Sequence, residues 1–157
     1  MDIFDTEEYE AIADFYGSRR AQRSQVPLIN HIDEGIAILQ EMCANQYAQK
    51  AFCLHPIVQN DEDIDVSWSD AYLLAVEYKN RANAYLCRPD TDYVRTHQDV
   101  YELVGPMSRN CALMLIADKR QNQKDFLQHH RNSHKRAEEL DRYFNIWLSY
   151  LHMELAK

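Results

Sequence analysis

The chain has 157 residues, of which 46% are hydrophobic and 27% charged, so one globular domain with a real core is expected. A formal net charge of −8 argues against binding to a nucleic-acid backbone, which calls for a basic surface. Three Gly and four Pro are too few for a turn-rich β-sandwich, and no apolar run reaches the roughly 20 residues of a membrane span.

Apolar residues recur at helical spacing along most of the chain, and no segment has a convincing strand pattern. The expected helices cover residues 6–17, 30–43, 46–58, 67 or 69–86, 93–104, 107–128 and 137–155. Arg88-Pro89-Asp90 and Gly105-Pro106 are expected to separate neighbouring helices. With no repeat and no low-complexity linker, residues 1–157 are predicted to form a single all-α bundle of about six to seven helices.

The four cysteines and the acidic first residues predict a cytoplasmic protein. The cysteines are far apart and show no CxxC spacing, so zinc binding by cysteine is not expected and the thiols should be reduced and mostly buried. The segment MDIFDTEEYE lacks the positive start of a signal peptide.

Polar residues interrupt apolar segments at three places. His31 ends VPLINH, His55 follows Phe52-Cys53-Leu54, and Asp118 follows the apolar run 113–117. Each has an ordinary explanation by itself, as a core or capping histidine or as an aspartate paired with an arginine. A buried carboxylate is nevertheless costly unless it meets a cation, a metal or several donors. Two imidazoles followed by a carboxylate suit a divalent metal such as Mn²⁺.

This order resembles the H…HD…D pattern of the HD superfamily, whose members are helical bundles. It is most similar to the hydrolase domain of RelA/SpoT-type alarmone enzymes, and the whole chain resembles a phage-encoded branch of that group, which would place it in a host cytoplasm. The likeness spans roughly residues 12 to 126 and rests on the segments RRAQRSQVPLINH, FCLHPIVQND and LIADKRQNQKD.

The resemblance implies roles for individual residues. His31, His55 and Asp118 stand at metal-binding positions. Asn122, one helical turn after Asp118, and Arg20 stand at positions near the nucleotide. The neighbouring basic residues would meet phosphates, where guanidinium groups suit the oxygens; they are Arg19 and Arg23, with Lys119 and Arg120 extending the patch.

The second segment departs from the family pattern. Pro56 stands where the family has its central aspartate, and a proline has neither a ligand atom nor a backbone N–H, so the local hydrogen bonding must differ. Gln59 and Asn60 replace an acidic pair, and an amide cannot exchange a proton at neutral pH. A substitute ligand could come from Asp61 or Asp63.

Three functions remain open. The leading hypothesis is a small-nucleotide-binding protein in which hydrolysis is weakened or lost. The alternative is an active metal-dependent phosphohydrolase with a non-standard ligand set. The third is an interaction module that keeps only the fold, with a homo-oligomer face on the last helix (Tyr143, Phe144, Trp147 and Tyr150), although core packing is the preferred explanation for these aromatic residues.

Overall fold

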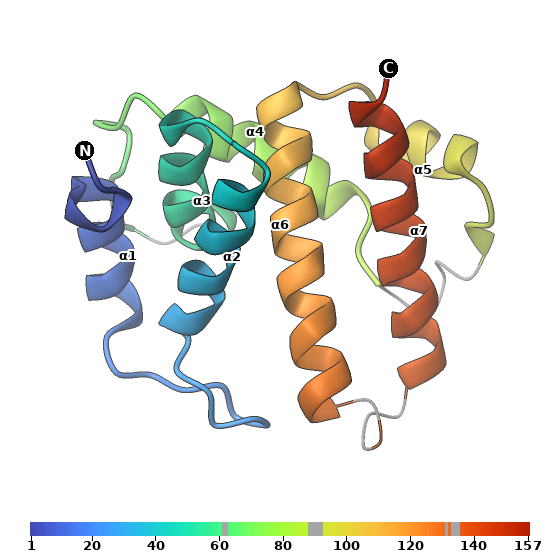
Figure 1. Ribbon diagram of the computed structural model, residues 1–157, viewed down its shortest axis with the longest axis horizontal. Coiled ribbons are helices and arrows are strands. Elements are labelled where there is room, and N and C mark those ends of the chain that lie inside the picture. Colours follow the sequence, from blue (N-terminus) through green and yellow to red (C-terminus); the bar gives the residue numbers. More distant parts are fainter. Residues whose placement is uncertain (61–62, 88–92, 131, 133–135) are drawn as a thin grey trace.

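The computed structural model describes residues 1–60, 63–87, 93–130, 132 and 136–157, and these residues form an all-α bundle (Figure 1). Its helices are α1 (Glu7–Tyr16), α2 (Ile29–Glu41), α3 (Gln46–Gln59), α4 (Tyr72–Ala84), α5 (His97–Val104), α6 (Arg109–Asp125) and α7 (Ala137–Leu155). A 3-10 turn precedes α1 and a π turn follows α6. Among the described residues the one β-type pairing is an isolated bridge between Arg20 and Pro27. The predicted fold class is confirmed.

Side-chain caps explain most helix starts. Thr6 begins α1 by accepting from the Tyr9 amide at 3.2 Å, and Thr96 with Asp99 forms a capping box that starts α5. The predicted start of α5 at residue 93 was therefore four residues early. The predicted cap of α4 at Ser67 or Ser69 was wrong, because the Ser69 hydroxyl donates to Glu8 Oε2 at 2.6 Å and accepts from the Ala71 amide in a turn before the helix. The predicted break at residues 88–90 lies outside the described residues.

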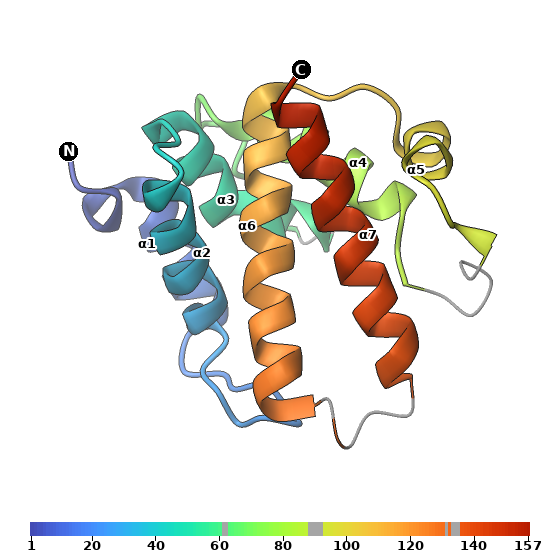
Figure 2. The same ribbon diagram turned by 45° about the vertical axis from the view of Figure 1, so that its right-hand side comes forward.

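Two helices supply the most deeply buried segments. Residues 51–57 of α3 and 111–119 of α6 are buried without interruption. Helix α6 runs through the middle of the molecule and packs against α2, α3, α4 and α7 (Figures 1 and 2). Because residues 51–57 and 111–119 are buried, polar side chains that point inward from α3 or α6 need partners within the protein.

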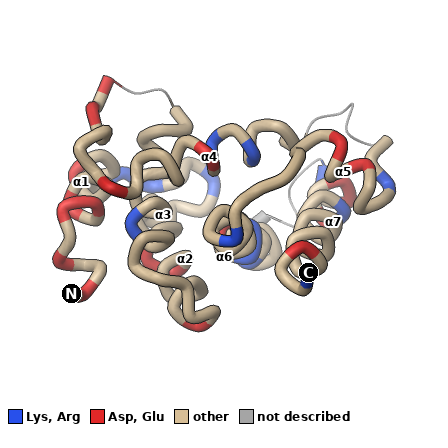
Figure 3. The backbone as a smooth tube through the Cα atoms, turned by 90° about the horizontal axis from the view of Figure 1, so that it is seen from above, with Lys and Arg blue, Asp and Glu red and all other residues tan. Residues whose placement is uncertain are grey.

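Charge is unevenly distributed among the helices. Helix α1 carries acidic residues and no Lys or Arg, whereas basic residues lie along α6 (Figure 3).

Helix α7 contributes its aromatic face to the core of this same chain. Tyr143, Phe144, Trp147 and Tyr150 are buried, and the Tyr143 hydroxyl and Trp147 Nε1 both donate to the Tyr85 carbonyl. Core packing is thus confirmed, and the use of these four residues as an oligomer face is wrong. No helix in the described parts of the chain has the length and apolarity needed to cross a bilayer.

Gly35 sets the distance between α2 and α3. A Cβ atom at this position would overlap the ring of Phe52, which is fully buried on α3. The Phe52 ring in turn packs against the imidazoles of His31 and His55, with centroid separations of 5.7 and 4.6 Å. Close approach of the two helices at Gly35 therefore places the two histidines.

We expect Gly35→Ala to destabilise the protein by about 1–3 kcal/mol through overpacking, although alanine favours a helix by about 1 kcal/mol. The matched control is Ala37→Gly in the same helix, where the exposed side chain reports only helix propensity. Urea unfolding measures both changes. A Gly35→Ala variant more stable than wild type would contradict the close contact with Phe52.

Candidate metal centre

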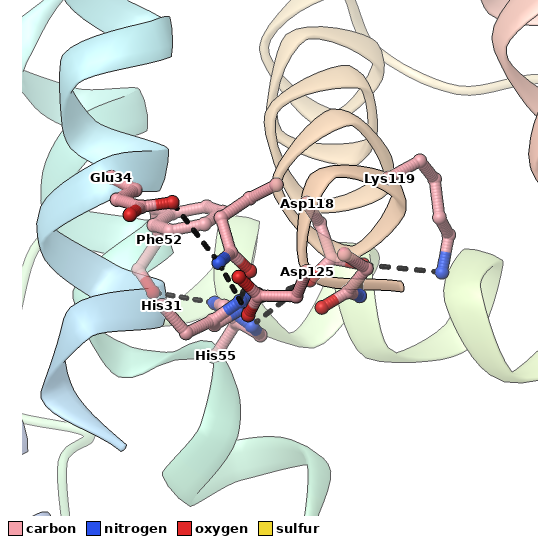
Figure 4. A network of polar contacts seen from close by, with 9 residues as sticks. His31, Glu34, Phe52, His55, Asp118, Lys119 and Asp125 are labelled. Atoms are coloured by element: carbon pink, nitrogen blue, oxygen red, sulfur yellow. Dashed lines mark hydrogen bonds and ion pairs between the residues drawn. The ribbon is translucent and has the colours of Figure 1, made fainter. Parts of the chain in front are cut away.

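Three side chains from three helices converge between α2, α3 and α6 (Figure 4). His31 Nε2 lies 3.0 Å and His55 Nε2 lies 3.7 Å from the same oxygen, Asp118 Oδ1. The three atoms all lie within 4.8 Å of one another. The structure thus brings together the three residues that the sequence proposed as metal ligands, although they are 24 to 87 residues apart in the chain.

Asp118 is a buried carboxylate with partners on both oxygens. Oδ2 lies 3.1 Å from Lys119 Nζ and accepts from Asn122 Nδ2 at 3.3 Å. Burial opposes ionisation of Asp118, but the Lys119 charge and the hydrogen bond with His31 outweigh it and hold the carboxyl pKa well below its usual range. Asp118 is therefore ionised at neutral pH, as a metal ligand must be. The predicted alignment of Asn122 with Asp118 is confirmed.

His55 has a single well-defined proton position in the metal-free protein. Its Nδ1 lies 2.5 Å from the carbonyl oxygen of Phe52, which can only accept, so Nδ1 carries the hydrogen. Burial lowers the pKa of His55 to about 3, despite the opposing charge of Asp118. The imidazole is therefore neutral at pH 7, with the Nε2 lone pair directed at the centre.

His31 Nδ1 is held by a different partner, the side chain of Gln121. Gln121 Nε2 donates to Asp125 Oδ2 at 2.8 Å and to Glu34 Oε2 at 3.3 Å, so its amide oxygen must face His31 Nδ1, with which it is in contact. His31 Nδ1–H therefore donates to Gln121, and Nε2 faces Asp118. Burial lowers the pKa of His31, but the hydrogen bond and charge of Asp118 outweigh it, and the pKa lies above its ordinary value.

The donor set fits a divalent cation. His31 Nε2 and Asp118 Oδ1 both present lone pairs across 3.0 Å, so a proton or a cation must lie between them. Ligand atoms bound at about 2.1 Å in a tetrahedron lie about 3.4 Å apart, which falls between the 3.0 and 3.7 Å separations of the two imidazole nitrogens from Asp118 Oδ1. Two imidazole nitrogens and one carboxylate oxygen suit zinc and manganese among other ions, and the donor set does not select one.

The three residues of the centre line a cleft of about 380 Å³. The walls combine polar side chains with apolar ones, and its lining residues are Tyr16, Leu28, His31, His55, Pro56, Gln59, Asn60, Tyr78, Asp118, Lys119, Asn122 and Asp125. The side chain of His31 keeps 20% of its surface exposed, whereas Asp118 keeps 6%. A small molecule entering the cleft would therefore meet the centre on the side of His31.

Pro56, Gln59 and Asn60 lie in the wall of this cleft. Gln59 Nε2 donates to Asn83 Oδ1 at 3.0 Å, and Asn60 Nδ2 donates to the Pro56 carbonyl at 2.7 Å. Both amides are thus engaged with the protein itself. Asp63, proposed as a substitute ligand, lines a different pocket together with Lys79 and Asn80, while Asp61 lies outside the described residues.

The predicted phosphate-binding arginines are not among the residues that line the cleft. Arg19 donates to the carbonyls of Phe15 and Tyr16, and Arg20 donates to the carbonyl of Gln25 at 2.8 Å. Arg23 and Arg120 are exposed. Of the basic side chains in the described residues, Lys119 is the one found in the cleft lining.

Several residues of the site were missed by the sequence analysis. Gln121 orients His31, Asp125 orients Gln121, and Tyr78 packs on His55 with centroids 4.7 Å apart. A signal for two of them was available, because positions 118, 121, 122 and 125 form a polar stripe at helical spacing on α6. No comparable pattern marks Tyr78.

Comparisons with known proteins give no match: no protein-family model, no curated protein and no solved structure is significantly similar to this chain. The likeness to the HD superfamily therefore stays a prediction from three sequence segments. The distances among His31, His55 and Asp118 do not depend on that likeness.

The low pKa of His55 predicts acid sensitivity. Unfolding returns the pKa from about 3 to about 6.5, so between these values the unfolded chain binds one more proton than the folded one. The contribution of neutral, buried His55 to the free energy of unfolding is complete above pH 6.5. It is lost as the pH falls toward 3, by about 1.4 kcal/mol per pH unit.

His55→Gln should reduce that slope by about this amount between pH 6 and 4, because glutamine does not titrate. Urea unfolding with chelator present, repeated across this range, measures the slope. His152→Gln, which removes an exposed histidine on α7, controls for loss of a histidine. An unchanged slope in His55→Gln would show that His55 is not buried in its neutral form.

Proposed function

We propose that the protein binds a divalent metal ion through His31, His55 and Asp118 and, through that ion, a small phosphorylated nucleotide, with hydrolysis weakened or lost. The observation that carries the proposal is the convergence of three potential ligand atoms within 4.8 Å of one another in the lining of a cleft. The HD-like reading of the sequence, with a signalling nucleotide such as an alarmone as ligand, is part of the same proposal. A volume of about 380 Å³ is in the range of small-molecule sites.

The charges in the cleft make the ion necessary for an anionic ligand. Without a metal, Lys119 Nζ lies against Asp118, and the proton between His31 and Asp118 is shared with the same carboxylate. A phosphate approaching the described cleft lining would then meet no positive charge that is not already paired with a carboxylate, and it would meet the charge of Asp125. A bound divalent ion supplies two positive charges and open coordination positions for phosphate oxygens.

The wall around the centre argues for weak hydrolysis. Activation of a water molecule calls for a group that accepts a proton near neutral pH, and Gln59, Asn60 and Pro56 cannot do so. Loss of general acid–base help typically costs 10²–10⁴-fold in rate. Binding of the ligand, by contrast, depends on the ion and on the shape of the cleft, and neither requires a proton-accepting side chain at these three positions.

Asp118→Asn should weaken Mn²⁺ binding at least 100-fold, because it removes the only carboxylate among the three proposed ligands. Asp14→Asn, which removes an exposed carboxylate on α1 away from the centre, should change the affinity by no more than a few-fold. Isothermal titration or Mn²⁺ electron paramagnetic resonance measures both variants after circular dichroism has shown that they are folded. Equal loss in the two variants would mean that Mn²⁺ is held by general negative charge.

Nucleoside di- and triphosphates and alarmones should bind more tightly than about millimolar in the presence of Mn²⁺, and should bind far more weakly with chelator or with Asp118→Asn. Titration against a nucleotide panel measures this, with released phosphate followed in the same samples. Binding that is indifferent to metal would contradict the proposed role of the ion. Sustained metal-dependent phosphate release, abolished by His55→Ala, would replace weakened hydrolysis with an active phosphohydrolase.

A further inference from the structure

The carbonyl of Phe52 lacks the backbone donor that an α-helix normally provides. In α3 this oxygen would accept from the N–H of the residue four positions on, but that residue is Pro56, which has no N–H. The site is buried: Phe52 is fully buried and His55 keeps 3% of its surface exposed, so water is not a ready substitute. A buried acceptor of this kind needs another donor.

The donor is the side chain of His55. Its Nδ1 lies 2.5 Å from the Phe52 oxygen, one turn back along the same helix. This bond satisfies the carbonyl that Pro56 leaves free and places the imidazole hydrogen on Nδ1. Nε2 is left with its lone pair, 3.7 Å from Asp118 Oδ1.

We propose that Pro56 is a positioning residue: by withholding a backbone N–H, it reserves the Phe52 carbonyl for His55 and fixes the tautomer in which His55 binds a divalent metal. The inference rests on the proposed metal centre. A residue with a backbone N–H at position 56 would share the carbonyl with the imidazole, and His55 would become free to rotate or to exchange its tautomer.

If Pro56 is a positioning residue, replacing it should change the stability of the fold and the affinity for Mn²⁺ in opposite directions. A proline inside a helix is destabilising, so Pro56→Ala should make the metal-free fold more stable and raise its thermal midpoint by a few degrees. The same change should weaken Mn²⁺ binding roughly tenfold, as is typical when the group that orients a ligating histidine is lost. A merely structural role for Pro56 predicts changes of stability and affinity in the same direction.

The missing N–H can be tested apart from the proline ring. Incorporation of lactic acid at position 56 gives the alanine side chain on an ester bond, which has no N–H. We expect this variant to recover Mn²⁺ affinity to within about twofold to threefold of wild type, whereas Pro56→Ala does not. If the ester variant binds as weakly as Pro56→Ala, or if Pro56→Ala binds Mn²⁺ as tightly as wild type, the proposal is overturned.

A second readout needs no metal. Two-bond ¹H–¹⁵N spectra of the histidines in metal-free protein, with His55 assigned by its absence from His55→Gln, report which ring nitrogen carries the hydrogen. Wild type and the ester variant should show His55 protonated at Nδ1, and Pro56→Ala should show a mixture of tautomers. An unchanged Nδ1–H form in Pro56→Ala would overturn the positioning role even if Mn²⁺ binds. Absence of Mn²⁺ binding in wild type would instead remove the metal centre and leave the tautomer result to decide what Pro56 does to His55.

Discussion

A single buried carboxylate organises this molecule. Asp118 follows a fully apolar run on α6, and an ionised group there is tolerable only if its oxygens are surrounded by donors and cations. Lys119 and Asn122 satisfy Oδ2, while the two imidazoles approach Oδ1. Helices α2 and α3 pack against α6, and each brings one histidine to the carboxylate.

His31 and His55 are each held in place by hydrogen bonds to groups outside the centre. Glu34 accepts from Lys124 at 2.8 Å and, with Asp125, holds the amide of Gln121, which in turn fixes His31. His55 is fixed by the backbone of its own helix. Both imidazoles therefore present Nε2 to one point before any ligand arrives. Such preorganisation lowers the free-energy cost of binding an ion, because the ligands need little rearrangement.

Lys119, Arg19 and Arg20 are each already bound to other groups of the protein. Lys119 is held between Asp118 and the rings of Tyr143 and Trp147, at 5.5 and 5.8 Å from their centroids, and its pKa is raised because the nearby carboxylate outweighs burial. Arg19 donates to carbonyls at the end of α1, and Arg20 donates to the Gln25 carbonyl in the segment before α2. The wall of the cleft therefore combines amide side chains with a lysine that is already paired with Asp118.

The sequence by itself determined the fold class, most helix positions and the three centre residues, because helical periodicity is local and a polar residue inside an apolar helix is conspicuous in a linear reading. It also located the polar stripe on α6 in part, through Asp118 and Asn122. The starts of α4 and α5 were predicted too early. Ser69 bonds to Glu8 on α1 instead of capping α4, and α5 begins at the capping box formed by Thr96 and Asp99. The orientation of His31 by Gln121, its contact with Asp118 and the bond between Ser69 and Glu8 were decided only by the tertiary structure. Each joins residues that are 61 to 90 positions apart in the chain, and packing between helices rather than spacing along the chain brings such groups within bonding distance.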